Sequence, residues 1–203
     1  MVLAMIMSSS IVIRNGFLET EKPRSVKRCA SCPPDIVFRC RSDSTVSTQV
    51  SEDIVANEMT TVMVRNIPTR YNAVSFLALL ADCGFSSFFD FFYLPMDFRT
   101  GKNMGYAFLN FTSSYYAQVF IAMFHNTPIG FSSSSKKVLD ISISKRQGLV
   151  NNVELFRNSD LLSSESFTYY KPFVQVQVWV RSEWQLVLVP LTNEVFTYIT
   201  NKI

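Results

Sequence analysis

The stretch KNMGYAFLNF, residues 102–111, interleaves large aromatic residues with the smallest ones. In a β-strand, successive side chains point to opposite faces of the sheet, so alternate residues share a face. The two faces of such a strand carry Tyr106, Phe108 and Asn110 on one side, and Ala107, Leu109 and Phe111 on the other. The second set is typical of a core beneath helices. The first set places two aromatic rings on a face that core packing alone does not explain.

The segments on either side of this stretch predict further strands and helices. Runs of β-branched and aromatic residues predict strands over 60–67, 87–94, 104–111 and 136–144, and runs with helical spacing predict helices over 72–84 and 115–126. Asn72 is the expected N-cap of the first helix, and Ser113 or Ser114 that of the second. The expected apolar face of the first helix consists of Val74, Leu77, Ala78 and Ala81, with Gly84 as its stop.

This order, β-α-β-β-α-β within about 85 residues, is typical of the ferredoxin-like split βαβ fold. We therefore predict an α+β domain with a four-stranded antiparallel sheet and both helices on one face. We expect the opposite face to be free of these two helices. It is the face on which the paired aromatic rings of the third strand are expected.

The chain divides into four segments by composition and pattern. Residues 1–59 mix Ser, Thr, Pro and both charge signs and are expected to be mostly disordered, and residues 60–148 form the domain. Residues 149–173 are expected to be a helical extension, with Leu149, Val150, Val153 and Phe156 on one side of a short helix. Residues 174–203 alternate as strands do and predict a β-hairpin or a three-stranded meander, with uncertain order.

Positive charge is concentrated in the predicted domain. The whole chain has a formal net charge of +3, and residues 60–148 hold eight Lys or Arg against four Asp or Glu, which gives +4. A polyanion-binding domain needs such an excess, although many ordinary domains also have it.

Two strands match the motifs of the RNA recognition motif (RRM). Its octamer reads basic-Gly-aromatic-small-aromatic-apolar-x-aromatic, and MGYAFLNF, residues 104–111, matches at seven of eight positions, with Met104 in the basic place. VMVRNI, residues 62–67, fits the partner hexamer except that Met63 replaces an aromatic residue. The spacing and the order of elements agree with both motifs.

These motifs predict a surface for single-stranded RNA. Unstacked bases stack on exposed aromatic rings, and each stacked base contributes about 1–3 kcal/mol. Tyr106 and Phe108 are the expected platforms, and Met63 is a flexible apolar surface beneath a base. The other expected RNA-binding residues are Tyr93, which we expect to face outward, Asn110 on the aromatic face, and the cations Arg65, Lys102, Lys145 and Arg146 as phosphate contacts.

A second interpretation stays open, in which the same fold is a protein-interaction module. The third helix or the C-terminal strands would then cover Tyr106 and Phe108, and the helices, the covered sheet or the C-terminal tail would contact protein partners. RNA binding that survives the loss of both rings would favour this interpretation.

Longer stretches resemble the C-terminal RRM of the Mei-two-like proteins. The family reads Asn-Ile-Pro-x-basic-Tyr after its first strand, Tyr-Leu-Pro-x-Asp-Phe after its second, and Gln-Gly after its fourth. These motifs are matched here by Asn66, Ile67, Pro68, Arg70 and Tyr71, by Tyr93, Leu94, Pro95, Asp97 and Phe98, and by Gln147 and Gly148. Met is usual in this family at the Met63 position. The resemblance covers residues 60–173 and implies RNA binding connected with meiosis and development.

The sequence predicts no enzyme, cofactor or metal. It has one histidine, no phosphate-cradling glycine loop and no paired acids suited to catalysis. Cys29, Cys32 and Cys40 are close together but have no fourth zinc ligand near them. The start of the chain is no secretory signal and no run reaches 18 apolar residues, so we expect a nuclear or cytoplasmic protein that is neither secreted nor membrane-bound.

Overall fold

A computed structural model describes residues 11–14, 17–20, 59–129, 137–180 and 183–201. Its main sheet has six antiparallel strands in the order β6-β3-β5-β4-β7-β8. The strands are β3 (Thr61–Arg65), β4 (Phe89–Tyr93), β5 (Tyr106–Phe111), β6 (Asp140–Ile143), β7 (Phe173–Val180) and β8 (Glu183–Pro190). The helices are α3 (Ala73–Asp82), α4 (Ser114–Phe124), α5 (Leu149–Glu154), α6 (Asp160–Ser163), the 3₁₀ helix η1 (Glu165–Tyr170) and α7 (Asn193–Thr200).

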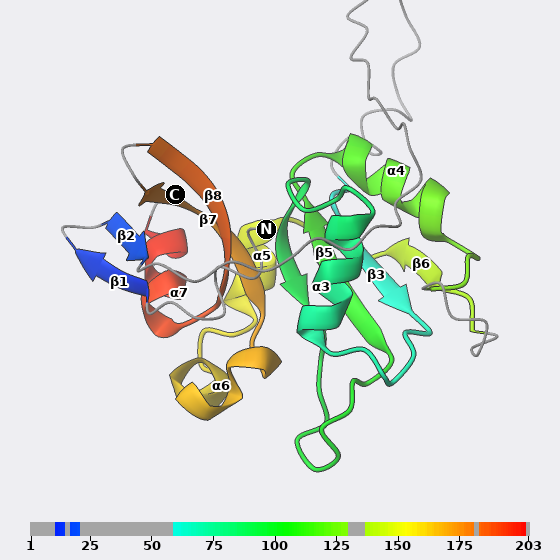
Figure 1. The fold of residues 1–203 in the computed structure, drawn as a ribbon, viewed down its shortest axis with the longest axis horizontal. Coiled ribbons are helices and arrows are strands. Elements are labelled where there is room, and N and C mark those ends of the chain that lie inside the picture. The colour runs from blue at the N-terminus through cyan, green and yellow to red at the C-terminus, as the bar shows by residue number, and fades with distance from the viewer. Residues whose placement is uncertain (1–10, 15–16, 21–58, 130–136, 181–182, 202–203) are drawn as a thin grey trace, which may run out of the picture.

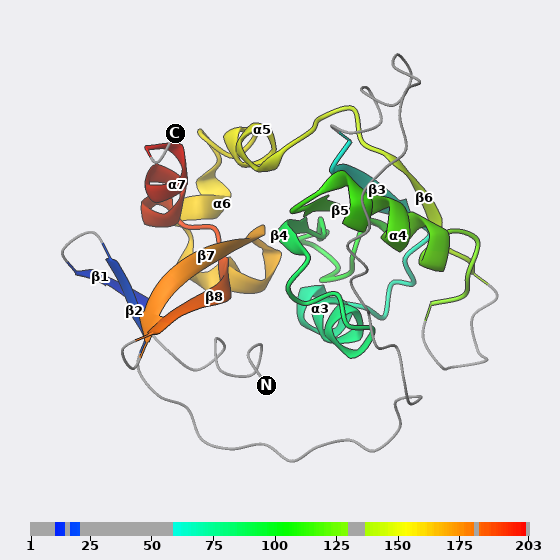
Figure 2. The ribbon, with the colours of Figure 1, turned by 90° about the horizontal axis from the view of Figure 1, so that it is seen from above.

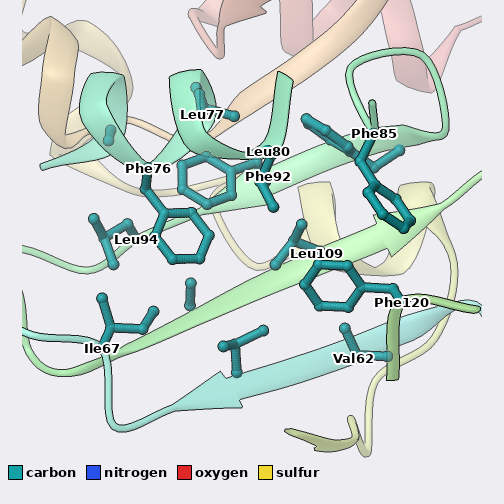
Figure 3. Packing of buried hydrophobic residues seen from close by; sticks show 14 of the residues in the cluster. Val62, Ile67, Phe76, Leu77, Leu80, Phe85, Phe92, Leu94, Leu109 and Phe120 are labelled. Atoms are coloured by element: carbon teal, nitrogen blue, oxygen red, sulfur yellow. The ribbon is translucent and has the colours of Figure 1, made fainter. Parts of the chain in front are cut away.

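The predicted β-α-β-β-α-β unit is confirmed as β3-α3-β4-β5-α4-β6. Its four strands form the ferredoxin-like sheet, and α3 and α4 cover one face of it (Figure 1). Figure 3 shows the core between them, in which Val62 and Leu109 of the two central strands face Phe76 and Phe120 of the helices. Phe111 is 1% exposed and belongs to the same core, as the alternation in β5 predicts.

The ends of α3 and α4 carry the predicted caps. The Asn72 side chain accepts a hydrogen bond from the Ser75 backbone N–H, and the Ser75 side chain accepts one from the Asn72 N–H, which completes a capping box. Gly84 has φ +82°, a left-handed conformation that favours glycine, and ends α3. Ser113, rather than Ser114, caps α4.

The expected inner face of α3 was partly wrong. The helix buries Ala73, Phe76, Leu77 and Leu80, whereas Val74, Ala78 and Ala81 are exposed or half-buried. The helix is apolar on most sides, so spacing alone does not select a face. The larger side chains decide it, because burying Phe76 and Leu80 removes more apolar surface from water than burying alanines does.

A β-bulge in β4 divides its aromatic residues between the two faces. The register against β5 shifts between Phe89 and Phe91. Phe89 and Phe92 therefore point into the core beneath α3 and α4, while Phe91 and Tyr93 point to the opposite face. Tyr93 thus lies on the predicted face, but it packs against a second core there and is only partly exposed.

The C-terminal segment extends the sheet. Strand β7 pairs with the outer edge of β4, with Phe91 opposite Val174 and Phe92 opposite Phe173, and β8 returns alongside β7. The hairpin alternative is thus correct, but a third strand over 195–200 is wrong, because that segment is the helix α7. The Thr192 side chain caps it, and Val195, Phe196 and Ile199 lie at helical spacing and are buried.

A second core lies on the face opposite α3 and α4. Figure 2 shows α5 and α3 on opposite sides of β4, with α7 beside the β7–β8 hairpin. This core consists of Phe91, Val153, Phe156, Leu162, Val174, Val176, Val178, Val187, Val189, Leu191, Val195, Phe196 and Ile199. The predicted helix after residue 148 is confirmed, and it joins the C-terminal hairpin to the face that carries the aromatic rings.

The described part of the N-terminal segment consists of β1 (Ile11–Arg14) and β2 (Phe17–Thr20), which pair antiparallel. The remaining residues up to 58, with Cys29, Cys32 and Cys40, lie outside the described residues, as does the expectation of disorder there. Among the described residues, no helix has both the length and the apolar character needed to cross a bilayer.

Candidate nucleic-acid interface

The two central strands align the predicted binding residues in rows across the sheet. Met63 of β3 lies opposite Phe108 of β5, which lies opposite Tyr93 of β4. In the next row Arg65 lies opposite Tyr106. The rings of Tyr106 and Phe108 meet edge to face, with centroids 5.8 Å apart, and both side chains are half-buried.

A groove of about 430 Å³ lies over these rows. Its floor is Met63, Phe108, Phe91 and Tyr93, and its lining is mostly apolar. One wall belongs to the α5 region and consists of Asn152, Leu155 and Phe156; the other consists of Ile143, Ser144, Lys145 and Arg146, with Arg65 completing the lining. Small-molecule sites in proteins commonly have this size and a mostly apolar lining with a few polar groups.

The C-terminal extension covers the aromatic face only in part. Phe156 meets the Tyr93 ring edge to face, with centroids 4.9 Å apart, and Phe108 packs against the second core. Tyr106 belongs to neither that core nor the groove lining. Phe108 therefore forms part of the groove floor beside the α5 wall, and Tyr106 lies next to the groove on the same face of the sheet.

Three of the four predicted phosphate contacts border the groove. Lys145 and Arg146 are exposed at the end of β6, and Arg146 donates from Nη1 to the Asn151 carbonyl at 3.3 Å. Arg65 is also exposed, and its Nη1 lies 3.3 Å from Asp140 Oδ2. An ion pair this exposed contributes little to stability, so Arg65 can exchange Asp140 for a phosphate at small cost.

The fourth, Lys102, lies outside the groove. It is exposed in the loop between β4 and β5, where its carbonyl accepts from the Asp97 N–H at 2.8 Å. The Asp97 side chain also accepts from the Arg99 N–H and the Thr100 hydroxyl, and these bonds lower the pKa of its carboxyl. The loop is thus shaped by Asp97, and Lys102 flanks the end of the sheet where Tyr106 begins β5.

The structure gives Asn110 a framework role instead of a surface one. It is 3% exposed, and its Oδ1 accepts from the hydroxyls of Thr60 and Thr61 at 2.8 and 2.7 Å. Its Nδ2 donates to Asp90 Oδ1 at 2.7 Å. Alternation in β5 predicted the correct face for Asn110. The side chain is nevertheless buried, because the start of α5 packs against β3 at this end of the sheet.

The Gln-Gly motif, Gln147 and Gly148, holds the start of α5 against β3. Gln147 Oε1 accepts from the N–H groups of Thr60 and Thr61, and its Nε2 donates to the carbonyls of Thr61 and Ser144. The Gly148 N–H donates to the Thr61 hydroxyl at 3.0 Å. These bonds fix the start of α5 against β3, and so they fix the wall of the groove.

Burial raises the pKa of two groups near the site. The pKa of Asp90 is raised by desolvation, against which the hydrogen bond from Asn110 acts. The pKa of Tyr93 is raised by desolvation and, to a smaller extent, by the nearby Tyr106 hydroxyl. Burial of Tyr93 thus disfavours its ionised form.

Sequence reasoning missed the wall residues Asn152, Leu155 and Phe156 as parts of the site. The helical spacing of Val153 and Phe156 signalled a buried side of α5, but not the surface that it packs on. Within the described residues, no group of three or more His, Cys, Asp or Glu side chains is arranged to hold a metal ion.

These features are similar to those of proteins of a known family. Residues 59–157 match the family model described as RNA recognition motif 2. "Protein MEI2-like 5" of Oryza sativa subsp. japonica is 35% identical over 129 residues, which are 62% of this chain and 16% of that protein. "Protein terminal ear1 homolog" of Oryza sativa subsp. indica is 32% identical over 143 residues, or 62% of this chain and 21% of that protein. The chain thus matches only a small part of these relatives' length.

Among solved structures, one described as "Structure of Rna15 RRM with bound RNA (GU)" aligns with a TM-score of 0.38 at 20% identity. The alignment covers 47% of this chain and 92% of that one.

Proposed function

We propose that the chain binds single-stranded RNA on its sheet and in the groove beside α5. Residues 59–157 match the family model RNA recognition motif 2 and are similar to MEI2-like and terminal ear1 proteins, which supports the proposal. The observation that carries the proposal is the row of Met63, Phe108 and Tyr93 beneath a groove bordered by Arg65, Lys145 and Arg146. Apolar and aromatic surface receives bases, and the cations at the border receive phosphates.

The geometry suits two adjacent nucleotides. One base enters the groove and stacks on Phe108, between the end of β6 and the α5 wall. The next base stacks on Tyr106, which lies outside the groove. The edge-to-face arrangement of the two rings means that the two bases are not coplanar, so the bound strand bends as it leaves the groove.

The biological role belongs to the same proposal. Relatives named MEI2-like and terminal ear1 support a role in post-transcriptional regulation during meiosis or development. The alternative, a protein-interaction module on the same fold, is supported by the partial cover of the sheet by α5 and the second core.

Replacing Tyr106 with Ala, alone and together with Phe108→Ala, tests the proposal. Fluorescence anisotropy with a pool of short single-stranded RNAs is expected to show a loss of affinity of about 1–3 kcal/mol for each stacked base. Tyr115→Ala is the matched control, because Tyr115 is 59% exposed but lies on α4, on the other face of the sheet. Unchanged affinity in folded Tyr106→Ala and double variants would favour the protein-interaction alternative.

Phe108→Ala is expected to cost some stability as well, because the ring packs against the second core. The sequence alone predicts a small stability loss for both rings. Thermal melting of each variant therefore accompanies the binding measurement, and Tyr106→Ala is the cleaner test of stacking.

A further inference from the structure

Asn152 is a polar residue in the apolar wall of the groove. It is 2% exposed and is one of the groove's lining residues. It lies in the middle of α5, where its neighbour Val153 is fully buried. A buried amide in such a wall must satisfy its donors and its acceptor or lose stability.

The two protons of the Asn152 amide are already used. Its Nδ2 donates to the Thr61 hydroxyl at 3.0 Å and to the Gly148 carbonyl at 2.7 Å. Because a carbonyl oxygen only accepts, the Gly148 contact fixes which end of the amide is nitrogen. The Asn152 side chain is therefore held in one orientation.

The oxygen of the same amide has no partner among the described residues. Hydrogen bonds account for both Nδ2 protons, and none reaches Oδ1. In the described part of the chain, no side-chain oxygen or nitrogen is both fully buried and without a partner. Asn152 Oδ1 therefore keeps some exposure, and Asn152 is one of the residues that line the groove.

A fixed acceptor beside an apolar floor distinguishes bases by their donors. Adenine, cytosine and guanine each carry an exocyclic amino group that projects from the ring and donates. Uracil has one donor on its pairing edge, the ring N–H, and a carbonyl oxygen on each side of it. Bringing that edge to Oδ1 would place oxygen near oxygen and leave carbonyls facing apolar side chains.

We infer that Asn152 reads the base stacked on Phe108, and that its Oδ1 selects a nucleotide with an exocyclic amino group over uracil. The inference rests on the proposed RNA-binding function and adds a specificity to it. Its physical basis is that phosphate contacts at the border position the strand without reading its sequence, whereas a base-edge hydrogen bond discriminates.

Binding of four uridine hexamers to the full chain tests this. One is all uridine; the others carry a single central adenosine, cytidine or purine ribonucleoside, the last being adenosine without its amino group. Adenosine and purine rings have similar stacking area, so their comparison isolates the hydrogen bond. The adenosine and cytidine probes are expected to bind about 3- to 10-fold more tightly than the purine and all-uridine probes, as the loss of one neutral hydrogen bond implies.

Two variants complete the design. Asn152→Leu removes the acceptor and is expected to bind the adenosine and purine probes equally. Asn151→Leu changes the neighbouring exposed amide, whose Nδ2 donates to the Gln147 carbonyl, and should keep the preference. Melting curves report whether Asn152→Leu folds. If it does not fold, the comparison of the adenosine and purine probes in the wild-type chain still tests the inference.

The outcomes separate the two proposals. Equal binding of the adenosine and purine probes to the wild-type chain would overturn the role of Asn152 while leaving RNA binding intact. A preference that persists in folded Asn152→Leu would do the same. Failure of every probe and of mixed-sequence RNA to bind would overturn the proposed function itself.

Discussion

Thr61 of β3 and Asn110 of β5 lie opposite each other and share a hydrogen bond of 2.7 Å, in which the Thr61 hydroxyl donates to Asn110 Oδ1. The same hydroxyl accepts from Asn152 Nδ2 and from the Gly148 N–H. Asn110 Nδ2 in turn donates to Asp90 Oδ1. One directed chain of bonds thus runs from α5 across β3 and β5 to β4. It ties the wall of the groove to the sheet that forms its floor.

Asn110→Ala is expected to lower the free energy of unfolding by about 1–3 kcal/mol, because it leaves the buried Thr61 hydroxyl without its acceptor. Urea denaturation measures this. Asn110 does not line the groove, and its Oδ1 and Nδ2 already have partners, so its loss removes no base contact. RNA affinity measured well below the melting temperature should therefore change much less than in Tyr106→Ala. A strong loss of RNA affinity in a stable Asn110→Ala chain would show that Asn110 contacts the RNA after all.

Phe111→Ala is expected to cost about 3–5 kcal/mol, because it empties a fully buried position between β5 and the helices. Its ring centroid lies 5.1 Å from that of Phe120 and 6.3 Å from that of Phe85, and both contacts are lost. Thermal melting measures the loss. Tyr115→Ala, an exposed aromatic change on α4, should melt close to the wild type, and similar melting of both variants would contradict the packing described.

Asp90 gives a pH-dependent prediction. Burial raises its pKa in the folded chain above the ordinary value of 3.8, so the folded state binds this proton more tightly than the unfolded state. The stabilisation from Asp90 is then fully present below pH 3.8, and it is lost as the pH rises through the raised pKa of the folded state. Asp90→Asn keeps an acceptor for Asn110 and removes the titration.

Urea denaturation of both chains across the acidic range tests this sign. The stability of the wild type relative to Asp90→Asn should fall as the pH rises above 3.8 and then level off. A difference that grows with pH over the same range would show that the Asn110 hydrogen bond, which lowers the pKa, outweighs desolvation.

Local patterns were sufficient to predict the central unit. Alternation in β5 placed Phe108 on the face opposite the helices and Phe111 in the core. Asn72, and the choice between Ser113 and Ser114, located both helix starts to within one residue. These features depend on residues close together in sequence, so a single chain reveals them.

The features that the sequence did not predict depend on contacts between segments that are distant in the chain. The bulge that turns Phe91 outward follows from packing on both faces of β4, and no residue pattern marks it. Asn110 seemed exposed because a polar residue on an otherwise open face usually is; its burial requires residues 147–152 to return to Thr61. The wall of the groove likewise exists because β7 pairs with the edge of β4 and brings the second core to that side.

The salt dependence of RNA binding tests the two cations at the end of β6. Single-strand binding that neutralises Z phosphates weakens with salt at a log–log slope of about −0.7Z. Lys145→Ala with Arg146→Ala removes up to two contacts, so the slope should flatten by roughly one unit. Sequence preference should change little, because phosphate contacts position the strand without reading it. The charge-matched control is Arg70→Ala with Lys137→Ala, two exposed cations that do not line the groove. Anisotropy titrations across a salt series should give parallel lines for the control and the wild type. Parallel lines for the Lys145 and Arg146 double variant would instead show that this pair does not touch the RNA backbone.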